Sequence, residues 1–294
     1  MTGDGTQQGR SGGGRVSSSH DVARQTQDGT AGGRTEARTT TPVLSVRGVS
    51  RNYGAVRALV DVDLDIHPHE VVAIVGDIGA GKSTLARVMS GALAPDTGTI
   101  ELDGRPVTMP STRDARAHGV AAVFQDLALC ENLDVVQNLF LGQELRRAGM
   151  LDERRMERRA WELMNQLAAR VPSVRAPVRA LSGGQRQAVA VARSLVGDPR
   201  VVIMDEPLAS LGISQTAEVL NMVERLRESG LGVVMISHSM VDVQAVADRI
   251  VVLRLGRING DFDAQHASYE DLIAAITGIT PTGRTPRRPG PDGV

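Results

Sequence analysis

Short runs of aliphatic residues recur along the chain, and most of them predict buried β-strands. The runs at 201–204 and 233–236 are continuously apolar, as expected for strands of a parallel sheet that is covered on both faces. Residues 216–228, which lie between them, follow a helical pattern, so this region predicts a βαβ unit. Apolar runs at 71–75 and 120–124 predict two further buried strands.

The segments nearer the amino end are shorter and alternate between apolar and polar side chains. Residues 43–49 and 59–66 bracket a turn near Asn52-Tyr53-Gly54, which predicts a β-strand on each side of that turn. Further predicted elements are a short strand between two turns at 96–104, strands at 250–254 and around Ile258, and a short helix near 268–277.

Residues 133–180 have a helical pattern. Five apolar positions recur on one face at helical spacing: Met156, Ala160, Leu163, Met164 and Leu167. Four arginines lie mostly on the opposite face, where solvation is favoured over a partner site: Arg154, Arg155, Arg158 and Arg159. Pro172 and Pro177 end this pattern, and a second amphipathic helix is predicted after Gly183.

Composition narrows the class of protein. The 294 residues carry a formal net charge of −1, so nothing global points to nucleic acid or to an anionic membrane surface. The single cysteine, Cys130, excludes a disulfide within the chain. No apolar run approaches the length of a membrane span, and the amino end has no hydrophobic signal core. We therefore expect a soluble, cytoplasmic protein that does not bind nucleic acid.

Both ends of the chain are polar and poor in large apolar residues. The first is rich in Gly, Ser, Thr, Gln and Arg, and the second in Pro, Gly and Arg. Segments of this kind cannot bury enough apolar surface to offset the entropy lost on ordering. We predict disordered tails at 1–42 and 279–294, and one folded domain at 43–278.

The stretch Gly76-Asp77-Ile78-Gly79-Ala80-Gly81-Lys82-Ser83 matches the phosphate-loop pattern G-x-x-x-x-G-K-[ST], and Thr84 begins a helix-compatible run. A predicted strand precedes the loop, as the motif requires. Glycines let the backbone approach phosphate oxygens closely, and consecutive N–H groups and the helix dipole attract the anion. Lys82 is expected to bind the β- and γ-phosphates of ATP, and the Ser83 hydroxyl to ligate Mg²⁺.

Two acids follow the apolar run at 201–204. Asp205 is placed to hold Mg²⁺, mostly through its waters, and Glu206 to act as the general base that activates the attacking water. A strand that ends in acids is a weak signal alone, and it becomes strong after a phosphate loop.

Ser182-Gly183-Gly184-Gln185 stands at the start of the second predicted helix. Ser182 is suited to cap that helix while backbone N–H groups stay free for a second anion. A plain helix cap without any ligand explains the same residues equally well.

With Leu181, these residues match the Leu-Ser-Gly-Gly-Gln signature of ABC-transporter ATPases, and the other motifs follow in that family's order over 43–278. The resemblance implies an α/β fold: a P-loop NTPase ABC-type nucleotide-binding domain with an antiparallel β subdomain and an inserted α-helical subdomain at about 126–180. It also implies that Tyr53 stacks on adenine. By the same resemblance, Gln125 contacts Mg²⁺ and water, and His238 lies near the γ-phosphate.

In proteins that this chain resembles, ATP is held between two copies. The phosphate loop of one copy faces the signature of the other, so Ser182, Gly183, Gly184 and Gln185 are expected to serve the partner's nucleotide. ATP binding closes the dimer and hydrolysis opens it. The helical subdomain is expected to offer a groove to a membrane permease, which places the protein at the cytoplasmic face of the membrane.

A narrower resemblance connects the chain to the ATPases of monosaccharide importers of the ribose, xylose, fructose and inositol type. It is carried by residues 123–135 and 138–142, by Gly76-Asp77 and by Leu211-Gly212. Many of those ATPases carry two fused ABC domains, whereas this chain has one phosphate loop. The resemblance implies a sugar-binding protein as an indirect partner.

Three positions depart from the wider family pattern: Ile78, where a polar residue is usual, Leu208 and Gly212. Ile78 leaves open a nucleotide-dependent switch that closes but hydrolyses weakly. An exporter ATPase shares every catalytic motif and is a second alternative. An ABC protein of translation or DNA repair is disfavoured, because such proteins usually carry a second ABC domain or a long coiled coil.

Overall fold

Two β-sheets organise the computed structural model, which describes residues 41–279. The predicted tails at 1–42 and 279–294 fall almost wholly outside that range. Within it, six strands form the larger sheet in the order β12-β11-β3-β10-β9-β6, and only β12 runs antiparallel to its neighbour. Its strands are β3 (Glu70–Val75), β6 (Val120–Val123), β9 (Val201–Asp205), β10 (Gly232–Ile236), β11 (Arg249–Arg254) and β12 (Arg257–Asp263).

The smaller sheet is antiparallel, and residues 41–279 supply four strands to it in the order β2-β1-β4-β5. These are β1 (Leu44–Tyr53), β2 (Val56–Ile66), β4 (Thr97–Leu102) and β5 (Arg105–Val107). The first three confirm predicted strands, although β1 continues to Tyr53 before the chain turns at Gly54, where φ is 59°. The three-residue strand β5 was not predicted.

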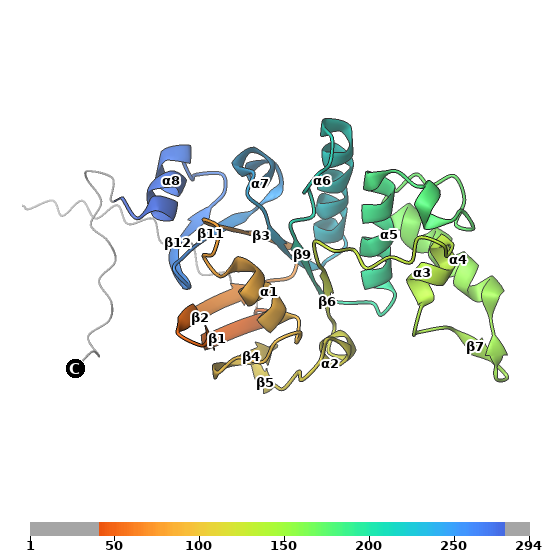
Figure 1. The fold of residues 1–294 in the computed structure, drawn as a ribbon, viewed down its shortest axis with the longest axis horizontal. Coiled ribbons are helices and arrows are strands. Elements are labelled where there is room, and N and C mark those ends of the chain that lie inside the picture. The colour runs from red at the N-terminus through yellow and green to blue at the C-terminus, as the bar shows by residue number, and fades with distance from the viewer. Residues whose placement is uncertain (1–40, 280–294) are drawn as a thin grey trace, which may run out of the picture. The chain divides into compact units, whose positions relative to one another are not determined.

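The helices of this part of the chain are α1 (Lys82–Met89), α2 (Thr112–Ala117), α3 (Val135–Phe140), α4 (Glu153–Gln166), α5 (Gly183–Leu195), α6 (Ile213–Glu228), α7 (Met240–Val246) and α8 (Tyr269–Thr277), with a 3₁₀ turn η1 (Val178–Ala180). Figure 1 shows α3, α4 and α5 grouped beside the β6 side of the larger sheet. Among the helices of residues 41–279, none is long and apolar enough to cross a membrane.

The region predicted as helical at 133–180 is helical only in part. It contains α3 and α4, but a small hairpin of β7 (Arg146–Arg147) and β8 (Met150–Leu151) separates them. The amphipathic pattern on α4 is confirmed, because the five apolar positions from Met156 to Leu167 are all buried. Arg154, Arg155 and Arg158 are exposed on its other side.

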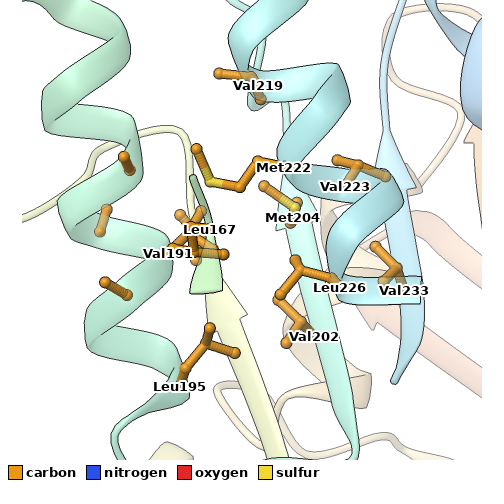
Figure 2. Close-up of a cluster of buried hydrophobic side chains, with 14 of the residues drawn as sticks. Leu167, Val191, Leu195, Val202, Met204, Val219, Met222, Val223, Leu226 and Val233 are labelled. Carbon is orange, nitrogen blue, oxygen red and sulfur yellow. The ribbon is translucent and has the colours of Figure 1, made fainter. Parts of the chain in front are cut away.

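The central strands are apolar throughout because both of their faces are covered. Val202 and Met204 of β9 lie in one buried cluster, which Figure 2 shows against α5 and α6, with Val191 and Met222 among its members. The alternate residue Ile203 packs into a second cluster with α1 and the smaller sheet. Successive side chains of a strand point to opposite faces, so continuous apolar runs are what two covered faces require.

Strands β3, β10 and β9 are parallel neighbours, so the loops that follow them lie at one edge of the sheet. The predicted βαβ unit is confirmed, since α6 connects β9 to β10 and Val202 pairs with Val233. In open α/β sheets, ligands bind outside the carboxyl ends of the strands. Three predicted motifs follow these strands: the phosphate loop, Glu206 and His238.

Candidate functional site

The loop between β3 and α1 has a backbone shape that requires glycine at two positions. Gly76 has φ 150° and Gly81 has φ 106°, and both are packed against neighbouring backbone. A Cβ on Gly76 would collide with the carbonyl oxygen of Leu253, and a Cβ on Gly81 with that of Ala58. Residues with side chains are therefore excluded from these two positions, and the loop packs directly against the backbone at Leu253 and Ala58.

Lys82, the first residue of α1, folds back beneath this loop. Its side chain is only 6% exposed, and its Nζ donates to the carbonyl oxygens of Gly76 at 2.8 Å and Asp77 at 2.9 Å. Burial lowers the pKa of Lys82, and the nearby charges of Glu206 and Asp77 oppose that shift. The ammonium group thus lies within the loop and is held by groups that an incoming anion can replace.

Ser83 and Asp205 bring α1 and the end of β9 together. The Ser83 hydroxyl donates to Asp205 Oδ1 at 3.2 Å, and Asp205 is 7% exposed. Burial raises the pKa of Asp205, while the hydrogen bond from Ser83 opposes the shift. A hydroxyl and a carboxylate that touch each other form a pair of oxygen donors suited to a hard cation.

Glu206 leaves the strand with a left-handed backbone, at φ 53°, while its N–H still donates to the carbonyl of Ile236 at 3.0 Å. Its Oε1 lies 2.9 Å from His238 Nε2. The angles at this contact do not make a hydrogen bond, so this buried oxygen has no hydrogen-bond partner among the described residues. Burial raises the pKa of Glu206, against the opposing charges of His238 and Lys82.

An open cavity of about 930 Å³ collects several of the predicted residues. Tyr53, Ser83, Gln125 and Asp205 line it, together with Arg87, Ala92, Leu93, Phe124 and Asp126. Tyr53 is 45% exposed and Gln125 is exposed, so both side chains can reach a molecule bound there. Four of the residues predicted to contact adenine, Mg²⁺ or water therefore line one cleft.

The predicted signature residues lie elsewhere. Ser182 caps α5 by accepting from Gln185 N at 3.3 Å, and Gln185 Oε1 accepts from Ser182 N at 2.9 Å. Ser182, Gly184 and Gln185 line a separate cavity of about 590 Å³ against α6. A Cβ on Gly184 would lie 2.9 Å from a carboxylate oxygen of Glu218, at the end of a side chain that can move aside. The structure therefore shows Ser182 as the cap of α5. Ser182, Gly184 and Gln185 are not among the residues that line the first cavity.

Arg51 is a neighbour of this cleft that motif reasoning missed. Its guanidinium lies 5.5 Å from the centroid of the Tyr53 ring and pairs with Asp96 at 2.6 Å. Residues two apart on a strand share a face, so the position of Arg51 before Tyr53 could have revealed this contact. The arginine gives the ring a cation–π partner that restrains it.

The glycine-shaped loop, its enclosed lysine and the adjacent serine–aspartate pair define a phosphate-loop nucleotide-binding protein of the α/β class. The model of the family described as "ABC transporter" matches residues 59–209. The chain belongs to the ABC transporter family.

Relatives and a solved structure agree with this assignment. The chain is similar to the fructose import ATP-binding protein FrcA of Rhizobium meliloti, with 41% identity over 81% of this chain and 94% of that protein. It is similar also to the xylose/arabinose import ATP-binding protein XylG of Sulfolobus acidocaldarius, with 39% identity over 80% and 94%. The fold resembles the ATP-binding cassette MJ0796, solved as a dimer in a post-hydrolysis state with ADP and Pi, at a TM-score of 0.64 and 25% identity over 75% of this chain and 98% of that one.

Proposed function

We propose that this chain is the ATP-hydrolysing subunit of an importer for monosaccharides. The observation that carries the proposal is the convergence of Lys82, Ser83, Asp205 and Glu206 at one edge of the sheet. The names of the relatives FrcA and XylG, which specify fructose and xylose/arabinose import, support the choice of cargo.

Nucleotide binding rests on the loop from Gly76 to Thr84. Its backbone N–H groups surround the phosphates, and Lys82 exchanges its two carbonyl acceptors for β- and γ-phosphate oxygens. Tyr53 offers a ring face to adenine. The Arg51 guanidinium, which forms an ion pair with Asp96, also contacts the Tyr53 ring and restrains it. The exchange at Lys82 replaces neutral acceptors by charged ones, and charge-assisted hydrogen bonds are the stronger kind.

The donor set fits Mg²⁺. Ser83 Oγ, Asp205 Oδ1 and the amide oxygen of Gln125 are hard oxygen ligands from three different elements around one cleft. When bound, Mg²⁺ would neutralise phosphate charge as bond breaking proceeds. The Ser83 hydroxyl is already oriented toward Asp205, so little rearrangement of these two side chains is needed.

Hydrolysis needs a base and a group that positions the water. Glu206 would take a proton from the attacking water as the oxygen of that water bonds to the γ-phosphorus and ADP leaves. Glu206 Oε1 accepts no hydrogen bond from residues 41–279, although His238 Nε2 lies 2.9 Å away, so this oxygen keeps the capacity to accept that proton. His238 lies beside Glu206, where its imidazole can contact the γ-phosphate. Gln125, which lines the cleft with Ser83 and Asp205, would orient the water.

A complete site needs a second copy of the chain. The signature residues Ser182, Gly184 and Gln185 line a different cavity from Tyr53 and Ser83. We propose that the signature, Gly183 included, contacts the nucleotide of the partner copy. The dimeric, ADP-bound state named for the relative MJ0796 supports this arrangement. ATP would close the dimer and loss of the γ-phosphate would open it.

Partners and location follow from this proposal. A permease would dock on the helical region that contains α3 and α4 and keep the chain at the cytoplasmic face of the membrane. A sugar-binding protein would deliver the cargo on the other side.

The test compares uptake of labelled fructose, xylose and ribose in a strain that lacks the gene, with the wild-type chain or Glu206→Gln restored. We expect uptake of at least one sugar with the wild-type chain only. No uptake of any sugar, despite ATP hydrolysis by the purified chain, would refute the cargo and leave the ATPase activity standing.

Ile78 favours a second candidate, a switch that binds ATP without efficient turnover. Its side chain is 89% exposed at the loop where a polar residue could hydrogen-bond phosphate or a partner copy. ATP-dependent dimerisation without phosphate release, measured with the permease present, would support the switch over the importer ATPase.

A further inference from the structure

Arg193, near the end of α5, connects that helix to the segment that follows Gln125. Its Nη2 donates to the carbonyl oxygen of Leu127 at 2.6 Å, and its Nη1 donates to that of Ala128 at 2.7 Å. Sixty-five residues separate the arginine from the nearer of these carbonyls, so the contact is tertiary. One planar guanidinium thus clamps two successive peptide groups.

In the described part of the chain, Arg193 interacts with backbone carbonyls and not with a carboxylate. Within residues 41–279 no carboxylate forms an ion pair with it, and burial lowers its pKa, with the nearby charge of Arg116 acting in the same direction. Burial of a cation without a carboxylate is costly, and hydrogen bonds to the two carbonyls offset that cost. The clamp therefore acts on the backbone conformation of the segment.

That segment has a conformation that needs support. Ala128 has φ 47°, a left-handed conformation that is unfavourable for alanine. The Asp126 carboxylate accepts from Ala128 N at 3.0 Å and tightens the same turn. Beyond it, the fully buried Asn138 accepts from Cys130 N at 2.8 Å and donates to its carbonyl at 3.0 Å. Arg193 and Asn138 thus hold the segment from α5 and from α3.

We propose that Arg193 is a positioning residue that fixes Gln125 relative to α5, the helix whose first turn carries Ser182 to Gln185. This inference rests on the proposed role of Gln125. A displacement of α5 then moves the segment 125–130 with it. The signature, which serves the partner copy's nucleotide, is thereby coupled to Gln125, which serves the nucleotide bound by the same chain. Arg193 does not line the cleft and acts only through the segment.

The kinetic experiment is a double-mutant cycle in the full-length chain between Arg193→Met and Gln125→Ala. If Arg193 acts through Gln125, Arg193→Met alone lowers kcat by about ten- to a hundredfold and leaves the KM for ATP within about twofold. In the Gln125→Ala background it then has less than about twofold further effect. Arg193→Lys, which can still reach one carbonyl, restores part of kcat. An equal fold loss in both backgrounds would overturn the proposal.

Hydrogen exchange tests the clamp independently of catalysis. Amides of residues 125–130 should exchange faster in Arg193→Met than in the wild type. Arg159→Met is the matched control, because Arg159 pairs with Asp198 at 2.6 Å on the exposed side of α4 and should leave this segment unchanged. Unchanged exchange in Arg193→Met would also overturn the proposal.

If Gln125→Ala retains full kcat, the assigned role of Gln125 fails, while the exchange result still decides whether Arg193 holds the segment 125–130. Should Arg193→Met not fold, the same measurements on Arg193→Lys decide both points.

Discussion

His238 Nε2 and Glu206 Oε1 stand 2.9 Å apart where the neighbouring strands β10 and β9 end. The register between the strands produces this pairing, since Ile236 lies opposite Asp205 and each functional residue follows one of them closely. The histidine charge lowers the pKa of a carboxyl that burial raises. A substitution of His238 is therefore expected to change the pKa of Glu206.

Glu206→Gln should keep ATP binding and slow hydrolysis by roughly 10²- to 10⁴-fold, because the amide has the same shape but cannot accept a proton. The variant should accumulate as a closed dimer with bound ATP. Phosphate release and size-exclusion chromatography with and without ATP measure the two effects. Hydrolysis at the wild-type rate would show that Glu206 is not the general base.

The burial of Glu206 should shift the acid limb of the kcat–pH profile to higher pH. Burial raises the pKa of Glu206, so the active carboxylate form is lost at a higher pH than for an exposed glutamate as the solution is acidified. His238→Ala removes a charge that lowers this pKa, so the acid limb of the kcat profile should move to higher pH. Charges of Lys82 and Asp205 act on the same carboxyl and stay in place in this variant. An acid limb at the same pH in His238→Ala would contradict the coupling.

Lys82→Ala should abolish nucleotide binding at ordinary ATP concentrations. The ammonium can form two hydrogen bonds to phosphate, and each bond to a charged group contributes about 1.5–3 kcal/mol, so an affinity loss of at least about a hundredfold is expected. Isothermal titration with ATP measures the loss, and a thermal unfolding curve establishes that the variant is folded. Tight binding retained by the folded variant would exclude the phosphate-loop interpretation.

Asp205→Asn should stabilise the nucleotide-free chain near neutral pH. Because burial raises the pKa of Asp205, the folded state binds this proton more tightly than the unfolded chain does. The associated stability is present at low pH and is lost as the pH rises through the raised pKa. Asparagine removes the buried charge and still accepts from Ser83, so Tm should rise.

Calorimetry at pH 7.5 tests the sign of that change. A gain on the order of 1 kcal/mol corresponds to about 2–4 °C in a domain of this size. The variant should also lose the Mg²⁺-dependent part of the stabilisation by ATP. Asp103→Asn, which alters an exposed carboxylate that pairs with Arg200, serves as the control and should leave Tm nearly unchanged. A lower Tm for Asp205→Asn than for the wild type would refute the argument.

Sequence reasoning located the strands wherever the hydrophobic pattern was local. The strand runs ending at Val75, Asp205 and Ile236 were readable because both faces are covered, and the parallel order of these strands then places their loops at one edge. Glycine at 76 and 81 could be predicted from the motif, although its collision partners in Leu253 and Ala58 are distant in sequence.

The elements that escaped prediction carry weak or conflicting local signals. α7 begins at the cap Ser239, but its Val241-Asp242-Val243 alternation is typical of a strand. The two-residue strands β7 and β8 are too short for any period to register. The contact of Arg193 with Leu127 and Ala128 joins a helix to backbone carbonyls, which carry no sequence signature.

Strands β6 and β9 are adjacent in the larger sheet, and β6 is the last of the strands that residues 41–279 supply to it. The segment 124–200, which connects β6 to β9, therefore leaves and rejoins the sheet at the same edge, without passing between other strands. Such a connecting segment can be replaced by one of different length while the pairing of the strands in the sheet is preserved. If a permease docks on this region as proposed, natural selection could in this way change the permease that the chain binds without changing the phosphate loop. A chimera that exchanges residues 124–200 is the corresponding engineering route.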